Sequence, residues 1–223
     1  FMNLAHEINS FPTFNTPTTR SVQGKDGLFY IYTSGTTGLP KAVIFTNSRW
    51  TLAYGTYGHV IDFKADDVMY CTLPLYHATG IVVCWCGVIA SSATLVIRRK
   101  YSTSSFWKDV QKFDASAIGY VGELCRYLMD VPEYELEKGH RVTKMIGNGM
   151  RPNIWDKFKA RFGIEEVLEL YASSEGNVGF SNVFNFDNTV GFSPTPYAVI
   201  QYDKEKNEPV RDKNGWCIKV KKG

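Results

Sequence analysis

The sequence predicts an α/β protein in which a layered, mostly parallel sheet is followed by the start of a smaller β-rich part. Segments typical of strands and helices alternate between residues 28 and 170, and such alternation favours parallel pairing. After residue 184 the pattern changes to short β-like pieces separated by prolines. We therefore expect three parts: an irregular N-terminal segment at 1–27, an α/β subdomain at 28–184 and a truncated β-rich subdomain at 185–223.

Local composition predicts where the individual elements lie. The run 28–32 is aromatic and β-branched and leads into a glycine-rich loop, from which a second strand leaves at 42–45. Pro152 suits the first turn of a helix that ends at Phe162, and Gly163 suits its C-terminal cap. The other elements expected are strands at 115–121, 144–146, 167–170, 197–202 and 216–220, a helix capped by serines near 102–105, and a helix from Glu123 that Pro132 closes.

Composition and charge restrict the class of protein. The 223 residues are 44% hydrophobic and 21% charged, which suits a globular protein with a sizeable core. The net charge of +3 is spread over many acidic and basic residues, so we expect no nucleic-acid partner. Five cysteines without regular spacing favour reduced thiols, and hence a protein of the cytoplasm or of a cytosol-facing membrane surface.

An uncharged stretch at 78–97 is long enough to be compared with a membrane span. Gly87 and a serine-rich polar run interrupt it. We therefore expect a short buried helix followed by a strand at 94–97 rather than a transmembrane helix.

The segment between the first two strands combines the groups that a phosphate-binding loop needs. Glycines let backbone amides point at phosphate oxygens, hydroxyls act as further donors, and a cation offsets the charge. The pattern differs from the Walker sequence because two residues separate Lys41 from Gly38. A plain glycine and threonine hairpin turn is the alternative interpretation. The candidate phosphate ligands are Thr33, Ser34, Gly35, Thr36, Thr37, Gly38 and Lys41.

Longer stretches of the sequence resemble one group of enzymes. The run YTSGTTGLPK at 32–41 is similar to the phosphate-loop signature of the adenylate-forming (AMP-binding) superfamily of acyl-CoA synthetases, peptide synthetase adenylation domains and luciferases. The resemblance implies the fold of that superfamily's large N-terminal domain. It is narrowed to the fatty acid transport protein, or very-long-chain acyl-CoA synthetase, family by PLYH at 74–77, YVGELCRYL at 120–128, IGNGMRP at 146–152 and EPVRD at 208–212.

The resemblance assigns roles to the residues that follow the last predicted parallel strand. The run YASSE at 171–175 is similar to the motif Tyr-Gly-x-Thr-Glu, which supplies an aromatic wall for adenine, a hydroxyl near phosphate and a carboxylate for magnesium. The chain departs from that motif at its second and fourth positions, where alanine and serine stand. By this resemblance Tyr171, Ser173 and Ser174 contact the nucleotide and Glu175 binds Mg²⁺. An exposed loop carboxylate is the alternative for Glu175.

Other site residues follow from the same resemblance. His77 is expected near the junction of the acyl and nucleotide pockets, in a positional role rather than as a general base. Tyr120 and Gly122 are expected to line the acyl channel. The residues expected to lie against the adenine are Gly147, Asn148 and Gly149, for which a plain turn is the alternative.

The implied activity is that of an AMP-forming CoA ligase for long or very long fatty acids. Fatty acid, ATP and coenzyme A are the expected substrates and Mg²⁺ the expected metal, with peripheral membrane association of the complete protein. Lys41, Glu175 and His77 are expected to serve catalysis through charge neutralisation and positioning. The chain starts at Phe1 and stops after Gly223 without a closing element, so we expect an internal fragment. The family's ribose-binding Asp and adenylation Lys are expected beyond it, and the fragment alone is expected to be inactive.

Two alternatives to this activity stay open. In one, the acid is a bile acid or a carnitine-type compound, because relatives use the same nucleotide motifs. In the other, the protein acts mainly in fatty-acid uptake or trafficking, as the family's name and the apolar run at 78–97 suggest.

Overall fold

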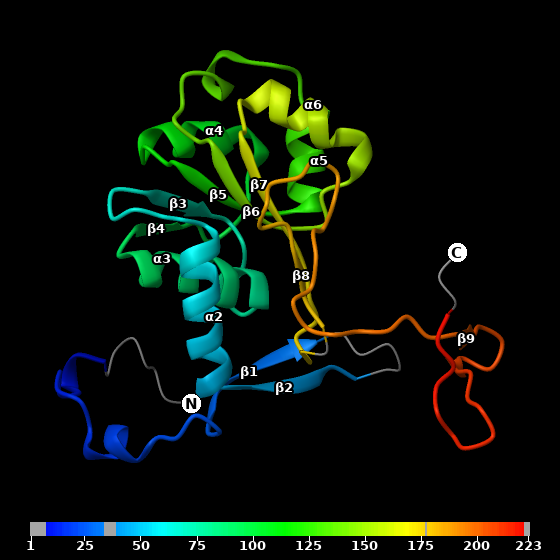
Figure 1. Cartoon of the computed structure of the whole chain (residues 1–223). Helices are drawn as coiled ribbons and strands as arrows, with labels where there is room; N and C mark the ends of the chain where they lie inside the picture. The colour runs from blue at the N-terminus through cyan, green and yellow to red at the C-terminus, as the bar shows by residue number, and fades with distance from the viewer. Residues whose placement is uncertain (1–7, 34–38, 177, 221–223) are drawn as a thin grey trace.

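The computed structural model describes residues 8–33, 39–176 and 178–220. Its centre is a six-stranded sheet with the order β4-β3-β5-β6-β7-β8 (Figure 1). All neighbouring strands are parallel except β7 and β8, which are antiparallel. The predicted α/β class with a parallel sheet is therefore confirmed. The strands are β3 (Val68–Cys71), β4 (Thr94–Ile97), β5 (Ala117–Val121), β6 (Lys144–Asn148), β7 (Glu166–Tyr171) and β8 (Phe180–Ser181).

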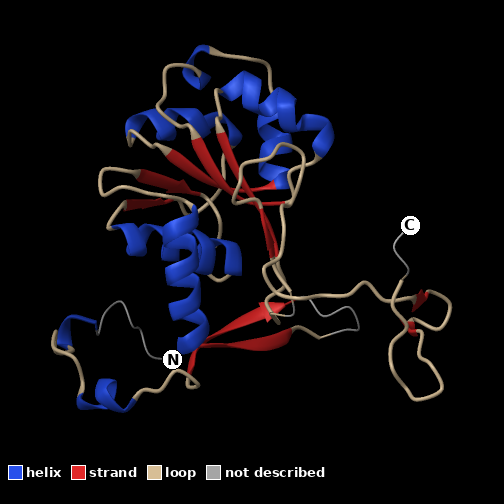
Figure 2. Cartoon of the chain, in the orientation of Figure 1, coloured by secondary structure: helices blue, strands red, loops and turns tan. Residues whose placement is uncertain are grey.

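Helices cover both faces of this sheet, so the fold has three layers (Figure 2). Parallel sheets take this arrangement because their strands are apolar on both faces and need cover on each. One face carries α4 (Thr103–Lys112), α5 (Gly122–Asp130) and α6 (Pro152–Phe162). The other carries α2 (Asn47–Val60), the π-helix η3 (Thr79–Trp85) and α3 (Cys86–Ser91).

The apolar core is divided in two by the sheet, because successive side chains of a strand point to opposite faces. Tyr70 of β3 and Ile118 of β5 pack in the cluster formed with α4, α5 and α6. Their neighbours Met69 and Ala117 pack instead with η3 and α3. The alternation along each strand thus fixes which helices cover which face. The largest helical side chains of the first cluster are Phe106, Trp107, Trp155, Phe158 and Phe162.

Local signals in the sequence place the helices of the first face correctly. α6 begins at Pro152 and ends at Phe162. The residue that follows the helix, Gly163, has a φ of +63°, the left-handed conformation that glycine adopts readily at a helix end. Ser102 occupies the N-cap position of α4, but its hydroxyl contacts those of Ser104 and Ser105 rather than a backbone amide. α5 and the parallel strands between α4 and β7 are also confirmed.

Two further strands form an antiparallel hairpin outside the main sheet, β1 (Gly27–Thr33) and β2 (Lys41–Thr46). Ile31 and Phe45 on its inner face pack against α2 and η3. Thr33 pairs with Lys41 at the end where the two strands are connected, and residues 34–38 of that connection lie outside the described residues. The glycine-rich segment therefore connects a hairpin, which agrees with both the turn and the phosphate-loop interpretations.

Neither α2 nor β3 is predicted from the sequence. α2 has tyrosines, glycines and threonines around most of its surface, and only Ala53 is fully buried among its side chains, so no apolar stripe marks it. Its first turn is capped by Thr46, whose hydroxyl accepts the backbone N–H of Arg49 at 3.4 Å.

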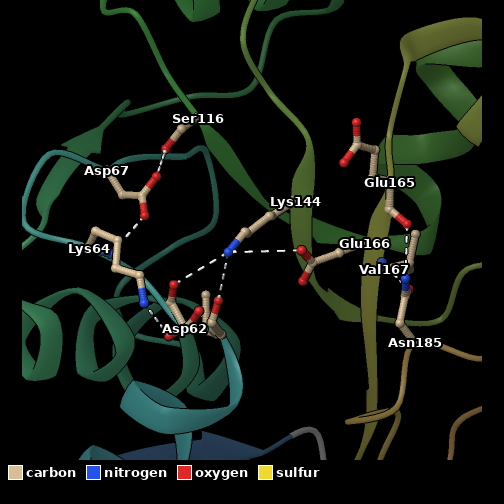
Figure 3. A network of polar contacts seen from close by, with 10 residues as sticks. Asp62, Lys64, Asp67, Ser116, Lys144, Glu165, Glu166, Val167 and Asn185 are labelled. Carbon is tan, nitrogen blue, oxygen red and sulfur yellow. Dashed lines mark hydrogen bonds and ion pairs between the residues drawn. The ribbon is translucent and has the colours of Figure 1, made fainter.

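Lys144 of β6 ties the far end of α2 to the sheet (Figure 3). Its Nζ donates to the carbonyl oxygens of Ile61 and Asp62, at 3.4 and 3.3 Å, where the helix ends. Glu166 of β7 lies 3.9 Å from the same ammonium group. A cation at a helix C-terminus is favourable because the last carbonyls there lack partners.

The apolar stretch at 78–97 folds as η3, α3 and β4, the helix and strand expected for it. Cys84 and Val88 lie in the buried core of the second face. Across the three described ranges, no helix has the length and apolar character needed to cross a membrane.

After β8 the chain first lies against α6, where Asp187 accepts from Trp155 and Lys159, and then returns so that Phe192 pairs with Ser181. Beyond Phe192 it extends away from the three layers toward the red end of the trace in Figure 1. The strands expected at 197–202 and 216–220 do not form in full, which corrects the prediction. The two segments still meet, since the N–H of Gln201 donates to the Ile218 carbonyl at 2.8 Å. The described elements here are β9 (Tyr202–Asp203) and β10 (Glu208–Pro209), and the N-terminal segment similarly holds two short 3-10 helices, η1 (Ile8–Ser10) and η2 (Pro17–Ser21).

Candidate functional site

A cavity of about 790 Å³ opens at the carboxyl ends of β6 and β7. α2 and η3 form one wall, and the segments that follow β6 and β7 form the other. Ligands of parallel α/β folds bind at this edge, because the loops there present backbone amides and side chains to a common crevice. The cavity is therefore the leading candidate for a binding site.

The structure brings predicted residues from three distant segments to this cavity. They come from the start of η3, the end of β6 and the end of β7. Gly147 does not line the cavity, because it precedes Asn148 in β6 and is buried within the strand. Ser34, Gly35, Thr36, Thr37 and Gly38 lie outside the described residues. The predicted residues that line the cavity are His77, Asn148, Gly149, Tyr171, Ser173 and Ser174.

The end of β1 meets the segment that follows β7. The hydroxyl of Thr33 lies 3.5 Å from Glu175 Oε1 and 3.5 Å from the Lys41 carbonyl oxygen, close enough to donate to either. Both distances are at the outer limit for a hydrogen bond, so these contacts are weak. Two motifs predicted separately, the loop that begins at Thr33 and the run that ends at Glu175, nevertheless adjoin each other beside the cavity.

Glu175 fits a Mg²⁺ ion that takes its other ligands from a substrate and water. Its carboxylate is exposed, and the Thr33 hydroxyl is its hydrogen-bond partner. The described residues contain no cluster of three or more acidic, histidine or cysteine side chains that could enclose a metal alone. Mg²⁺ commonly uses one or two carboxylates together with phosphate oxygens, and Glu175 supplies one such carboxylate.

The end of β6, with Gly147 in the strand and Gly149 just after it, packs tightly against the end of β5. A Cβ atom on Gly147 would lie 1.9 Å from the Tyr120 carbonyl oxygen, and one on Gly122 would lie 1.7 Å from the Gly149 carbonyl oxygen. No side chain fits at such separations. Gly149 itself has a φ of +85°, in the left-handed region. The glycines therefore let two strand ends approach each other under the cavity.

Glu169 of β7 is a buried carboxylate next to the residues that follow β6. It is 2% exposed and accepts the backbone N–H groups of Gly149 and Met150, the second at 3.3 Å, and the hydroxyl of Tyr120. Burial raises the pKa of Glu169, and the hydrogen bonds from Tyr120 and the two amides oppose that shift. Burial, followed by the charge of Glu169, raises the pKa of Tyr120 well above its usual value.

These contacts show what Tyr120 does in this structure. Its side chain is fully buried and is not among the residues that line the cavity, where the resemblance would place it. Its hydroxyl instead helps Glu169 hold the turn after β6.

His77 lines the cavity and lies two residues before η3 begins at Thr79. Its Nδ1 accepts the backbone N–H of Thr79 at 3.3 Å, so Nε2 carries the proton in the neutral ring. The Thr79 hydroxyl donates to the side-chain oxygen of Asn148 at 3.0 Å. This chain of contacts joins η3 to the end of β6 and is consistent with a positional role for His77.

Arg49, on the first turn of α2, also lines the cavity. Its guanidinium donates to the Ile44 carbonyl at 3.4 Å and to the Ser174 carbonyl at 2.8 Å. One side chain thus connects the hairpin to the segment after β7.

The remaining wall of the cavity is largely apolar. It is formed where α2 faces the π-helix η3. A π-helix has a wider turn than an α-helix and is often found at functional sites. The wall consists of Leu52, Ala53, Thr56 and Tyr57 from α2 and Ala78, Val82 and Val83 from the η3 region.

Comparison with known proteins identifies the family. The model of the AMP-binding enzyme family matches residues 3–215. The chain belongs to this family.

Curated relatives within the AMP-binding enzyme family are similar over most of the chain. The medium/long-chain-fatty-acid–CoA ligase FadD6 of Mycobacterium tuberculosis is 44% identical over 95% of this chain and 36% of the relative. Long-chain fatty acid transport protein 2 of Rattus norvegicus is 45% identical over 87% of this chain and 32% of the relative. The chain therefore spans about a third of the length of these relatives.

Solved structures show the same fold. The N-terminal domain of FACL13 from Mycobacterium tuberculosis has a TM-score of 0.72 at 22% identity, over 96% of this chain and 52% of that one. ATP-bound MatB from Rhodopseudomonas palustris has a TM-score of 0.70 at 23% identity, over 85% of this chain and 38% of that one.

Glu169 and Arg49 are among the cavity residues that are not predicted from the sequence. Glu169 does carry a signal, because it is the one charged residue in the apolar run 167–170 of a strand expected to be buried. A carboxylate at such a position needs partners, which points to a polar site. Arg49 carries no comparable signal in the sequence, since α2 itself is not predicted.

Proposed function

We propose that the chain supplies the nucleotide- and acyl-binding part of an AMP-forming fatty acid–CoA ligase, called the complete ligase below. The observation that carries the proposal is that three segments adjoin at one cavity. They are the end of β6 with Asn148 and Gly149, the segment 171–174, and the hairpin end where Thr33 contacts Glu175. Membership of the AMP-binding enzyme family and the similarity to a fatty acid–CoA ligase support it.

Each part of the site has a role in this proposal. The exposed ring of Tyr171 and residues 147–149 at the end of β6 flank the adenine, while Ser173 and Ser174 offer hydroxyls to the nucleotide. The loop from Thr33 to Lys41 receives the β- and γ-phosphates through amides, hydroxyls and the lysine cation. Glu175 would bind Mg²⁺, which neutralises phosphate charge when bound.

The proposed reaction requires the protein to position the reactants and to neutralise charge. A carboxylate oxygen of the fatty acid attacks the α-phosphorus of ATP, the bond to the bridging oxygen of the β-phosphate breaks, and pyrophosphate leaves with its electron pair. The sulfur of coenzyme A then attacks the acyl carbon and AMP departs. No covalent bond to the enzyme is needed, so the side chains act by holding the reactants in line and offsetting the growing charge.

The apolar wall between α2 and η3 suits the acyl chain. It adjoins the nucleotide segments, so a fatty acid lying along it would bring its carboxylate toward the α-phosphate near His77. A fatty acid is favoured over a bile acid or a carnitine-type acid by the names of the relatives. A coenzyme A site, the ribose-binding Asp, the adenylation Lys and peripheral attachment to a cytosol-facing membrane belong to the proposal for the complete ligase.

The test is fatty-acid-dependent exchange of pyrophosphate with ATP in the complete ligase. We expect Lys41→Ala and Glu175→Gln each to reduce exchange by about a hundredfold, because each removes charge stabilisation at the phosphates. The matched controls Lys108→Ala and Glu135→Gln change exposed residues outside the cavity and should leave the rate unchanged. Full exchange in both site variants would contradict the proposal.

Fatty-acid uptake is a second candidate function, because several relatives are named as long-chain fatty acid transport proteins. The same Lys41→Ala variant separates the two. Uptake by cells that falls together with exchange supports ligation as the primary activity, whereas uptake that persists without exchange supports transport as an independent function.

A further inference from the structure

We propose that Arg49 is a further nucleotide-binding residue, whose guanidinium binds a phosphate group of the nucleotide. The inference rests on the proposed function, because it concerns the same cavity. Arg49 belongs to none of the motifs recognised in the sequence, and the structure brings it to the cavity through α2.

The guanidinium is held in place between two parts of the site. Nη1 donates to the carbonyl of Ile44 on β2 at 3.4 Å, and Nη2 donates to the carbonyl of Ser174 at 2.8 Å. Its Cζ atom lies 4.4 Å from the centre of the Phe45 ring, which supports the flat group from one side. These partners orient the cation and do not neutralise it, since the two acceptors are uncharged carbonyls.

The charge of Arg49 has no counter-ion in the described residues. Every ion pair found there joins other side chains. Glu175, next to Ser174, contacts the Thr33 hydroxyl instead. An unneutralised, half-buried cation beside a cavity favours an anionic ligand, and the planar guanidinium matches phosphate geometry. The phosphates of ATP are the anions that the proposed reaction brings to this position.

Gly176 shows how closely the chain bends around this group. Its φ is +81°, and a Cβ atom there would lie 3.1 Å from Nη2 of Arg49. The backbone at Gly176 therefore lies directly against the guanidinium of Arg49. The cation is thus located where the hairpin meets the run 171–175.

Calorimetry on the complete ligase with ATP and with adenosine tests the inference. Arg49→Gln should weaken ATP binding about ten- to a hundredfold and change adenosine affinity by less than about twofold, because adenosine has no phosphate. Arg49→Lys should recover part of the lost ATP affinity, since lysine keeps the positive charge but lacks the paired N–H donors of the planar guanidinium. The control Arg126→Gln removes another half-buried arginine, whose Cζ also lies over an aromatic ring, 4.6 Å from the centre of Tyr127, but which is not at the cavity.

Two results would overturn the inference. One is an unchanged affinity for ATP in Arg49→Gln. The other is an equal loss of affinity for ATP and for adenosine, which would mean that Arg49 only positions the segment 173–176. If Arg49→Gln does not fold, Arg49→Lys decides by the same comparison, with an expected loss for ATP of about three- to tenfold. Either negative result in a ligase that still binds ATP and forms acyl-AMP leaves the proposed function standing. A complete ligase that binds no ATP overturns both.

Discussion

Glu169 shows what a single buried carboxylate requires. Three donors surround it, two backbone amides and the hydroxyl of Tyr120, and they offset much of the cost of removing the charge from water. Because its pKa is raised in the folded state, the protein binds this proton more readily folded than unfolded. Its contribution to stability is therefore complete below the unfolded pKa and is lost as pH rises through the folded pKa.

His140 makes the opposite contribution, and we expect stability to fall in mild acid because of it. Its ring stacks on Trp107 at 4.5 Å, and its Nδ1 accepts the N–H of Val142 at 3.2 Å. Burial lowers its pKa, so the unfolded chain takes up a proton first. Stability is complete above the unfolded pKa of about 6.5 and decreases as pH falls through the lower folded value. Urea unfolding of the chain measured from about pH 7.5 to about pH 5 should show a falling midpoint.

The matched comparison for this pH effect uses two histidine variants. His140→Gln should lose most of the decrease, whereas His59→Gln, which changes an exposed histidine on α2, should retain it. An unaltered pH profile in His140→Gln would assign the effect to other groups.

At the scale of elements, the tight contact between the ends of β5 and β6 gives a contrast between two glycines. Gly147→Ala should cost about 2–3 kcal/mol, because its methyl group would meet the Tyr120 backbone and force the strands apart. Gly55→Ala in α2 should instead gain about 0.5–1 kcal/mol, because the space there is open and alanine favours a helix. Chemical denaturation of the two variants measures both changes. Equal effects would contradict the crowding argument.

The elements also show how much the sequence could predict. α6 is predicted with both of its ends because Pro152 and Gly163 mark them locally. The parallel strands β4, β5, β6 and β7 are predicted because their apolar runs are short and alternate with helices, whereas the parallel strand β3 is not predicted. α2 is not, because its amphipathic pattern is weak and its helical state depends on packing with η3 and the hairpin. The candidate site likewise has a part with a local sequence signal and a part without one. Residues 171–175 carry a motif, whereas the contact of Arg49 with Ser174 joins residues that no local pattern connects.

At the scale of the whole molecule, α2 and the hairpin form a unit whose attachment to the sheet includes Lys144. We expect Lys144→Met to cost about 1 kcal/mol, because it removes the donor to two helix-end carbonyls while keeping most of the side-chain volume. Hydrogen exchange should become faster in α2 and remain unchanged in β5 and α6.

The control for this attachment is Lys157→Met, which changes an exposed lysine on α6. It should alter neither stability nor exchange. Faster exchange in β5 and α6 as well as α2 would show that Lys144 stabilises the whole sheet rather than the attachment of one layer.

The contact between Thr33 and Glu175 has a consequence for the order of folding. The two residues are 142 positions apart, and Arg49 and Ser174 are 125 apart. Closing a flexible loop of that length costs about 4 kcal/mol of chain entropy, more than one weak hydrogen bond returns. The strands and helices between them must assemble first and shorten the effective loop. The cavity is therefore expected to be among the last features to form, and an early folding intermediate would have its sheet but no binding site.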